Sequence, residues 1–297
     1  MMDHILTTSG LTKKYGDKVA AGNIDIHIRK GEIYGLIGRN GAGKTTIMRV
    51  ISGLSTATSG SYQFHDESGR GIGVLIEEPG VYKNRSAFDN LKIKCIAMNC
   101  YSAQYVNDLL KIVGLADVGK KKVGSFSLGM RQRLGIALAL AGDPELIVLD
   151  EPINGLDPQG IAEIRETLEK LRDEKGVTIM VSSHILDELG KIADSYGIIN
   201  NGELIAEFTR EELLQRCGKY LTIHTDNNEK AVEVIRSTGI EGVAVSENAI
   251  RINDIPENAA QINKALIDNG LLVDEFHATN LSLEDYYLNL TGGAAHE

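Results

Sequence analysis

The stretch GRNGAGKTT at residues 38–46 decides the fold of this chain. It has the spacing G-x-x-x-x-G-K-[ST], in which glycines let the backbone turn tightly and aim N–H groups inward. The apolar residues 33–37 before it predict a buried strand, and residues 47–54 after it predict a helix. A helix start carries about half a positive charge, which favours phosphate. We therefore predict a strand–loop–helix unit that binds the phosphates of a nucleotide.

The residue types of this loop have separate tasks in binding. Lys44 is predicted to reach the outer phosphates as a point charge, and the Thr45 hydroxyl is predicted to hold magnesium. The alternative is a glycine-rich turn that fits the pattern by accident, and the strand before it and the helix after it argue against that. Lys44 is also a predicted catalytic residue. The predicted nucleotide-binding residues of the loop are Gly38, Asn40, Gly41, Gly43, Lys44, Thr45 and Thr46.

The composition excludes some classes of protein. The 297 residues include 31 Lys and Arg against 41 Asp and Glu, a net charge of −10. We therefore expect no nucleic-acid partner, because such a partner favours a basic face. The three cysteines have no metal-ligand spacing, and their odd number fits a reducing compartment. The longest apolar windows fall short of the ~18–20 residues that span a bilayer, so we expect no transmembrane segment.

The first 217 residues predict one α/β domain. Apolar residues at helical spacing indicate a helical part at about residues 85–141, and Asn201-Gly202 predicts a hairpin turn. The predicted strands are 5–8, 18–21, 24–28, 33–37, 61–64, 73–76, 146–149, 177–182, 197–200 and 203–208. The predicted helices after the phosphate loop are 90–98, 105–113, 130–141, 161–175 and 184–193.

Residues 218–297 predict a second, small α+β domain. The predicted order is β-α-β-β-α-β, the split βαβ arrangement of ferredoxin-like domains. It is followed by a helix at 283–290. No catalytic motif occurs in this domain, so we expect it to dock or regulate. The predicted elements are strands 220–225, 243–246, 249–252 and 271–277, with helices 228–237 and 257–268.

An apolar strand at residues 145–152, ELIVLDEP, delivers two acids at its carboxyl end. Ligands of open α/β sheets bind at that end. Asp150 is predicted to belong to the magnesium shell, and Glu151 is predicted to act as the general base toward an attacking water. The alternative, a strand that ends in a solvated acidic turn, is disfavoured by Lys44 upstream.

Further motifs follow in a fixed order: SFSLGMRQR at 125–133, NGLD at 154–157 and SSH at 182–184. With them, residues 3 to about 215 resemble the ATP-binding subunit of ABC transporters. The resemblance implies a RecA-like core with an antiparallel β subdomain and a helical subdomain. It also implies that Tyr15 stacks on adenine, that Ser127 and Gly129 form a signature loop, and that His184 contacts the γ-phosphate and orients Glu151. The alternatives are a strand-edge Tyr15, a structural His184, and a Ser127 that only caps the next helix.

The same resemblance implies how the chain works. ATP and Mg²⁺ would be its cofactors. Two copies would pack head to tail, so that the signature loop of one copy completes the ATP site of the other. Asp157 would lie in the loop that crosses this dimer interface. The closing and opening of this pair would change the conformation of separate transmembrane permease subunits. The chain would therefore be a peripheral subunit at the cytoplasmic face of the membrane.

Two positions depart from the common family pattern. Glu77 stands where a glutamine is usual, and its carboxylate is predicted to accept metal or water, so the predicted metal set is Thr45, Asp150 and Glu77. Leu128 stands at the usual first glycine of the signature loop and is expected to crowd it. Together with PGVY at 79–82 and SLEDYY at 282–287, these departures resemble the bacitracin-resistance and lantibiotic-immunity branch of exporters. That branch implies export of peptide antibiotics or immunity to them.

Two other functions stay open at this point. The chain could be an ATP-dependent dimerisation switch with little turnover, which Glu77 and Leu128 suggest and which Glu151 and His184 argue against. It could also be a soluble ABC ATPase that acts on DNA or ribosomes. Such proteins carry a long coiled-coil insertion or two cassettes in one chain, and this sequence contains one cassette without the insertion.

Overall fold

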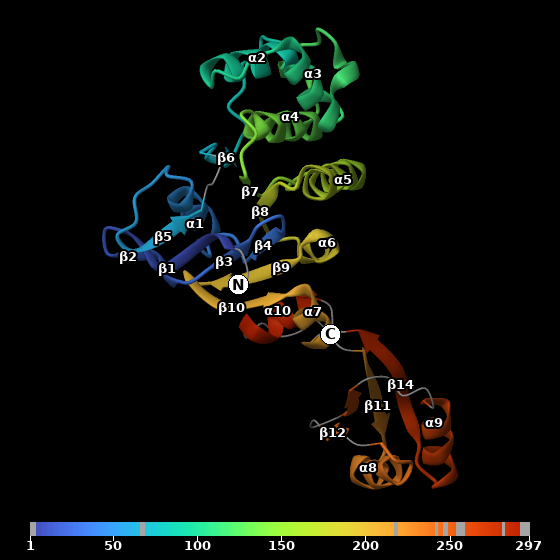
Figure 1. The fold of residues 1–297 in the computed structure, drawn as a ribbon. Helices are drawn as coiled ribbons and strands as arrows, with labels where there is room; N and C mark the ends of the chain where they lie inside the picture. The colour runs from blue at the N-terminus through green and yellow to red at the C-terminus, as the bar shows by residue number, and fades with distance from the viewer. Residues whose placement is uncertain are drawn as a thin grey trace. The chain divides into compact units, whose positions relative to one another are not determined.

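The computed structural model describes residues 4–65, 69–216, 219–240, 243–245, 249–253, 259–280 and 283–291. The chain divides into two compact units, Met1–Arg210 and Glu211–Glu297 (Figure 1). In the part of the chain that the structure describes, no helix combines the length and the apolarity needed to cross a membrane.

Within the described residues, the central sheet of the first unit has six strands in the order β10-β9-β4-β8-β7-β6. The strands from β9 to β6 run parallel, and β10 pairs antiparallel with β9. Every residue of β4, β7 and β8 is buried, because helices and a second sheet cover both faces. The strands are β4 (Ile33–Ile37), β6 (Ile72–Leu75), β7 (Leu146–Asp150), β8 (Thr178–Ser183), β9 (Ser195–Asn200) and β10 (Glu203–Thr209).

A smaller antiparallel sheet forms around the long strand β1 (His4–Tyr15). Its other strands are β2 (Lys18–Ile24), β3 (His27–Arg29) and β5 (Ser59–Phe64). One buried apolar cluster joins this sheet to helix α1 (Lys44–Ile51) and to the central sheet; it includes Leu6, Ile47 and Val148. The packing therefore holds the residue that ends β1, Tyr15, on the same rigid body as the phosphate loop.

Three α-helices, with two short 3-10 helices (Ala116–Val118 and Val123–Ser125), form the helical part, and Figure 1 draws the α-helices together beyond β6 and β7. They are α2 (Ala87–Ala97), α3 (Ala103–Ile112) and α4 (Leu128–Leu140), and α4 packs against β6. Each begins two or three residues earlier than the apolar pattern predicts. The reason is a serine N-cap before each helix, whose hydroxyl accepts a backbone N–H of the first turn. The caps are Ser86, Ser102 and Ser127.

The remaining helices of the sheet layers are α5 (Pro158–Lys175) and α6 (Leu186–Ile192), and α7 (Arg210–Arg216) follows β10. The prediction that α6 starts at His184 is wrong. The Ser183 hydroxyl accepts the N–H of Ile185 at 2.8 Å, which forms a local turn and delays the helix. His184 therefore lies in a turn between β8 and α6.

The second unit contains an antiparallel sheet in the order β12-β13-β11-β14 among the residues that are described. Strand residues such as Leu221 and Ile250 pack with Ile235 of helix α8 and Leu266 of helix α9. The order β-α-β-β-α-β is the predicted one, and Cys217 and Ser282 lie outside the described residues. The elements are β11 (Lys219–Thr225), α8 (Asn228–Ser237), β12 (Val243–Val245), β13 (Ile250–Asn253), α9 (Ala259–Asp268), β14 (Val273–Asn280) and α10 (Leu283–Thr291).

Cys95 and Cys100, at the end of α2, are free thiols. Burial, with Cys100 close by, raises the pKa of the Cys95 thiol to about 12. A thiol with so high a pKa forms little thiolate at neutral pH, so it is a poor nucleophile and a poor metal ligand.

Candidate functional site

The phosphate loop runs between the end of β4 and the start of α1, where the strand–loop–helix prediction placed it. Two of its glycines are required by close backbone contacts. A Cβ on Gly38 would lie 2.6 Å from the carbonyl oxygen of Ile199, and a Cβ on Gly43 would lie 2.5 Å from that of Ala20. Gly43 also has a φ of 114°, which side chains rarely allow. The loop is thus pressed against β9 on one side and β2 on the other.

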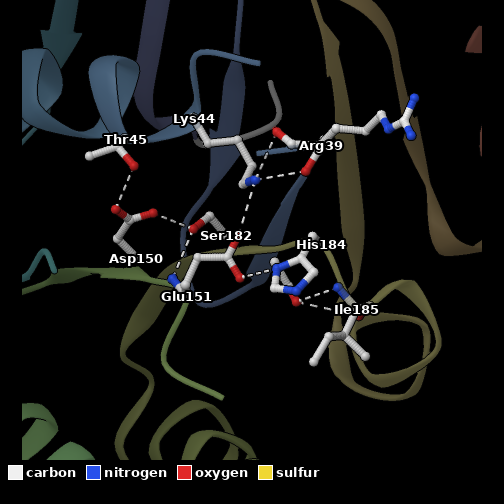
Figure 2. A network of polar contacts seen from close by, with 10 residues as sticks. Arg39, Lys44, Thr45, Asp150, Glu151, Ser182, His184 and Ile185 are labelled. Atoms are coloured by element: carbon white, nitrogen blue, oxygen red, sulfur yellow. Dashed lines mark hydrogen bonds and ion pairs between the residues drawn. The ribbon is translucent and has the colours of Figure 1, made fainter. Parts of the chain in front are cut away.

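Lys44 lies at the floor of the site and is only 5% exposed. Its Nζ donates to the Gly38 carbonyl oxygen at 2.6 Å and to the Arg39 carbonyl oxygen at 3.3 Å. It also lies 3.0 Å from Oε1 of Glu151, an ion pair that Figure 2 marks with a dashed line. A buried ammonium group held by oxygen atoms in this way is positioned to bind the oxygens of a phosphate.

Asp150 is fixed by two hydroxyl groups. Thr45 Oγ1 donates to Oδ2 of Asp150 at 2.7 Å, and Ser182 Oγ donates to Oδ1 at 2.6 Å. Ser182 also accepts the N–H of Glu151 at 3.0 Å. It stands beside Asp150 because β7 and β8 are parallel neighbours and pair these two residues. Sequence reasoning missed Ser182, although it lies in the SSH motif.

Glu151 is held in an unfavourable conformation and between two partners. Its φ of 49° is in the left-handed region, which costs energy for a residue other than glycine. Its Oε2 is 2.7 Å from Nδ1 of His184, and its Oε1 faces Lys44. Strained residues with converging polar partners gather at active sites. The three predicted catalytic residues, Lys44, Glu151 and His184, therefore form one connected network (Figure 2).

A cavity of about 530 Å³ opens over the phosphate loop. This volume is within the range of pockets that bind small ligands. Its lining includes five residues that sequence reasoning did not assign to a site: Lys18, Val19, Ala20, Asn201 and Gly202. It also includes these predicted residues: Tyr15, Asn40, Gly41, Gly43, Lys44, Thr45, Thr46 and Glu151.

Tyr15 forms part of one wall of this cavity. The side chain is 49% exposed, and the Lys13 ammonium lies 5.1 Å from the centre of its ring. An exposed ring of this kind offers a flat apolar surface on which a base can stack.

Glu77 is not brought to Thr45 and Asp150. Its carboxylate pairs with the guanidinium of Arg49 on α1, and its side chain is 65% exposed. Its φ is 63°, so the backbone turns sharply just after β6. Sequence reasoning missed Arg49, since no motif marks it. Thr45 and Asp150 are therefore the two predicted metal ligands that touch each other.

The oxygens of Thr45 and Asp150 fit magnesium. Mg²⁺ prefers oxygen ligands, usually takes few of them from protein, and fills the remaining positions with water and phosphate. The described residues contain no group of three His, Cys, Asp or Glu side chains that could hold a metal ion by itself.

Ser127 and Gly129 lie at a different place, a second hollow of about 490 Å³. Two helices begin there. Ser127 caps α4 by accepting the N–H of Met130 at 3.2 Å, and Asp157 caps α5 by accepting the N–H of Gly160 at 2.9 Å. Leu128 lines the hollow and is 39% exposed.

Known proteins resemble this chain, some of them over nearly its whole length. The family model described as "ABC transporter" matches residues 21–154. The "Bacitracin transport ATP-binding protein BcrA" of Enterococcus faecalis is 39% identical over 302 residues, which cover 99% of this chain and 98% of that relative. The "Lantibiotic transport ATP-binding protein SrtF" of Streptococcus pyogenes is 47% identical over 208 residues, which cover 68% of this chain and 90% of SrtF.

Solved structures give the same picture for the fold. The "ADP conformation" of MJ1267, described as an ATP-binding cassette of an ABC transporter, aligns with a TM-score of 0.64 at 28% identity. That alignment covers 72% of this chain and 94% of MJ1267. The cbiO1 protein of Clostridium perfringens aligns with the same TM-score at 26% identity, over 78% of this chain and 94% of cbiO1.

Proposed function

This chain belongs to the ABC transporter family as an ATP-binding subunit, an ATPase, and on that premise we propose that it powers a separate membrane permease that expels peptide antibiotics. The observation that carries the catalytic part is the network of Lys44, Glu151 and His184 at the floor of one cavity. Because relatives named as transport proteins match nearly the whole chain, transport is favoured over a dimerisation switch and over a soluble ATPase.

The residues of the cavity have distinct roles in hydrolysis. Lys44 binds the outer phosphates of ATP, and the backbone N–H groups of the loop surround them. Glu151 accepts the proton of the water that attacks the γ-phosphorus, while the bond to the ADP oxygen breaks. His184 holds the carboxylate of Glu151 in place through their 2.7 Å contact. Tyr15 stacks on the adenine.

Thr45 and Asp150 are the residues that hold Mg²⁺, which when bound neutralises the charge that develops on the phosphates. Their hydrogen bond of 2.7 Å keeps both oxygens at the same place beside the loop. Ser182 holds the other carboxylate oxygen of Asp150, Oδ1, by its own hydrogen bond. Glu77 joins this group only after leaving Arg49.

Two copies of the chain act together, head to tail. The hollow at Ser127 and Gly129 lies apart from the ATP cavity, yet it presents helix N-termini, which favour phosphate. In this proposal the phosphate that reaches the hollow belongs to the ATP bound by the other copy. Binding of ATP therefore closes the pair, and release of phosphate lets the two copies separate.

The permease docks on the groove between the helical part and β6. This groove of about 310 Å³ is lined by residues of α2, α4 and the segment 79–82. Tyr82 and Ile93 are 58% and 42% exposed there, so apolar surface is open to a partner. The chain thus acts at the cytoplasmic face of the membrane as a peripheral subunit.

The likeness to BcrA and SrtF supports peptide antibiotics as the cargo. The match to BcrA covers 99% of the chain and therefore includes the second unit. The element order of that unit and its sheet order β12-β13-β11-β14 support a ferredoxin-like domain, whose role we propose to be docking or regulation of the same transporter.

Resistance of living cells tests this function. We expect a sensitive bacterium that expresses the chain with its permease to survive a higher concentration of bacitracin or of a lantibiotic than the same cells without them. The Glu151→Gln variant abolishes this gain, because the permease is no longer powered. Inhibitory concentrations that stay at the level of empty cells for every peptide antibiotic tried, or that rise equally with the variant, contradict the proposal.

A further inference from the structure

The turn between β9 and β10 forms part of the wall of the ATP cavity. Its two residues, Asn201 and Gly202, have φ angles of 49° and 85°. Two-residue hairpin turns with both angles positive favour the sequence Asn-Gly, so the local sequence explains this geometry. Hairpin chemistry does not explain why the turn lies at a nucleotide cavity.

Gly202 ties the phosphate loop to β2. Its N–H donates to the carbonyl oxygen of Ala42 at 2.9 Å, and its carbonyl oxygen accepts the N–H of Gly22 at 2.7 Å. A Cβ at this position would lie 3.2 Å from the carbonyl oxygen of Ala20. The turn therefore sets the spacing between the phosphate loop and the strand that carries Val19.

Asn201 brings an uncommitted amide group to this place. The side chain is exposed and lines the cavity, and it has no hydrogen-bond partner among the residues that the structure describes. An asparagine amide has two N–H donors and a carbonyl acceptor. That set matches a pair of hydroxyl groups, which both donate and accept.

The position of the turn indicates which part of ATP it meets. Tyr15 and Val19 of the β1–β2 hairpin line the cavity, and so do Gly43 and Lys44 of the phosphate loop. The proposed function places the adenine on Tyr15 and the phosphates at the loop. Gly202 is bonded to both sides, to β2 and to the phosphate loop. Between a stacked adenine and bound phosphates lies the ribose.

We propose that Asn201 binds the ribose hydroxyls of ATP, and that Gly202 is the positioning residue that holds Asn201 there. This inference rests on the proposed function, since it requires ATP in this cavity. It adds a nucleoside contact from β9–β10 to the phosphate contacts from the loop. Together with the stacking of Tyr15 on adenine, this contact lets the cavity distinguish a nucleotide from a polyphosphate.

The Asn201→Gly variant tests the contact, because Gly-Gly also forms this type of turn and only the side chain is lost. The matched control is Asn99→Gly, which makes the same change at a left-handed asparagine (φ 55°) that does not line this cavity. We expect calorimetry to give Asn201→Gly an ATP affinity about three- to tenfold weaker than wild type, the net effect of one lost hydrogen bond. Its affinity for inorganic tripolyphosphate is expected to stay the same, and Asn99→Gly to match wild type for both probes.

The 2′,3′-dideoxy analogue of ATP gives a second readout that a merely structural role of Asn201 does not move. Wild type is expected to bind it about three- to tenfold more weakly than ATP, and Asn201→Gly to bind the two equally. An unchanged affinity of the variant for ATP, an equal loss for ATP and tripolyphosphate, or a dideoxy difference that survives in the variant overturns the inference. If wild type itself fails to bind ATP, the proposed function fails instead.

Discussion

The Glu151→Gln variant is expected to hydrolyse ATP at least about a hundredfold more slowly than wild type, because a general base contributes about 10²- to 10⁴-fold to the rate. Glutamine has the size and shape of glutamate, and its amide can still contact Lys44 and His184. It cannot accept a proton from water. The loss therefore falls on the chemical step, while ATP affinity is retained.

Phosphate release with the permease present measures this effect, and ATP titration confirms that the variant still binds. The matched control is Glu166→Gln, which makes the same change at an exposed carboxylate paired with Lys170 on α5. That control is expected to keep wild-type turnover. Turnover of Glu151→Gln within a few fold of wild type assigns the proton transfer to another group.

The Lys44→Ala variant is expected to bind ATP about a hundredfold more weakly, or worse. Charge-assisted hydrogen bonds contribute about 1.5–3 kcal/mol each, and a buried ammonium group at the floor of the cavity makes them to the outer phosphates. The fold is retained, because the loop conformation rests on Gly38 and Gly43 and on the strand and helix that flank it. Removal of Lys44 also leaves Glu151 without its cationic partner.

Titration with ATP measures the loss of affinity, and circular dichroism shows whether the fold is retained. Lys170→Ala is the control, since Lys170 is an exposed lysine on α5 paired with Glu166. It is expected to leave ATP affinity unchanged. An affinity of Lys44→Ala equal to that of wild type removes Lys44 from the phosphate site.

The sequence was sufficient to predict the cassette fold, which the solved relatives confirm, because its signals are local. The phosphate loop, the strand that ends in Asp150 and the turn at Asn201-Gly202 each need only a few consecutive residues. In the helical part the predicted helices start two or three residues after the observed ones. Apolar spacing locates the buried face of a helix and not its serine cap.

The contacts that sequence reasoning missed depend on the pairing of distant segments. Ser182 reaches Asp150 because β7 and β8 pair in one particular register, 32 residues apart in the chain. Arg49 reaches Glu77 because α1 passes beside the end of β6. Asn201 reaches the cavity because β9 lies next to β4 in the sheet. No single-sequence pattern specifies which strands become neighbours.

The central claim is that ATP joins two copies of the chain, with Ser127 of one copy facing the phosphates bound by the other. Light scattering of the isolated Glu151→Gln protein with saturating Mg-ATP tests it most directly. We predict the mass of two chains with ATP, and of one chain without ATP or when Ser127→Arg is added to the same protein. A single-chain mass under ATP saturation, in a protein that calorimetry shows to be fully bound, contradicts the account.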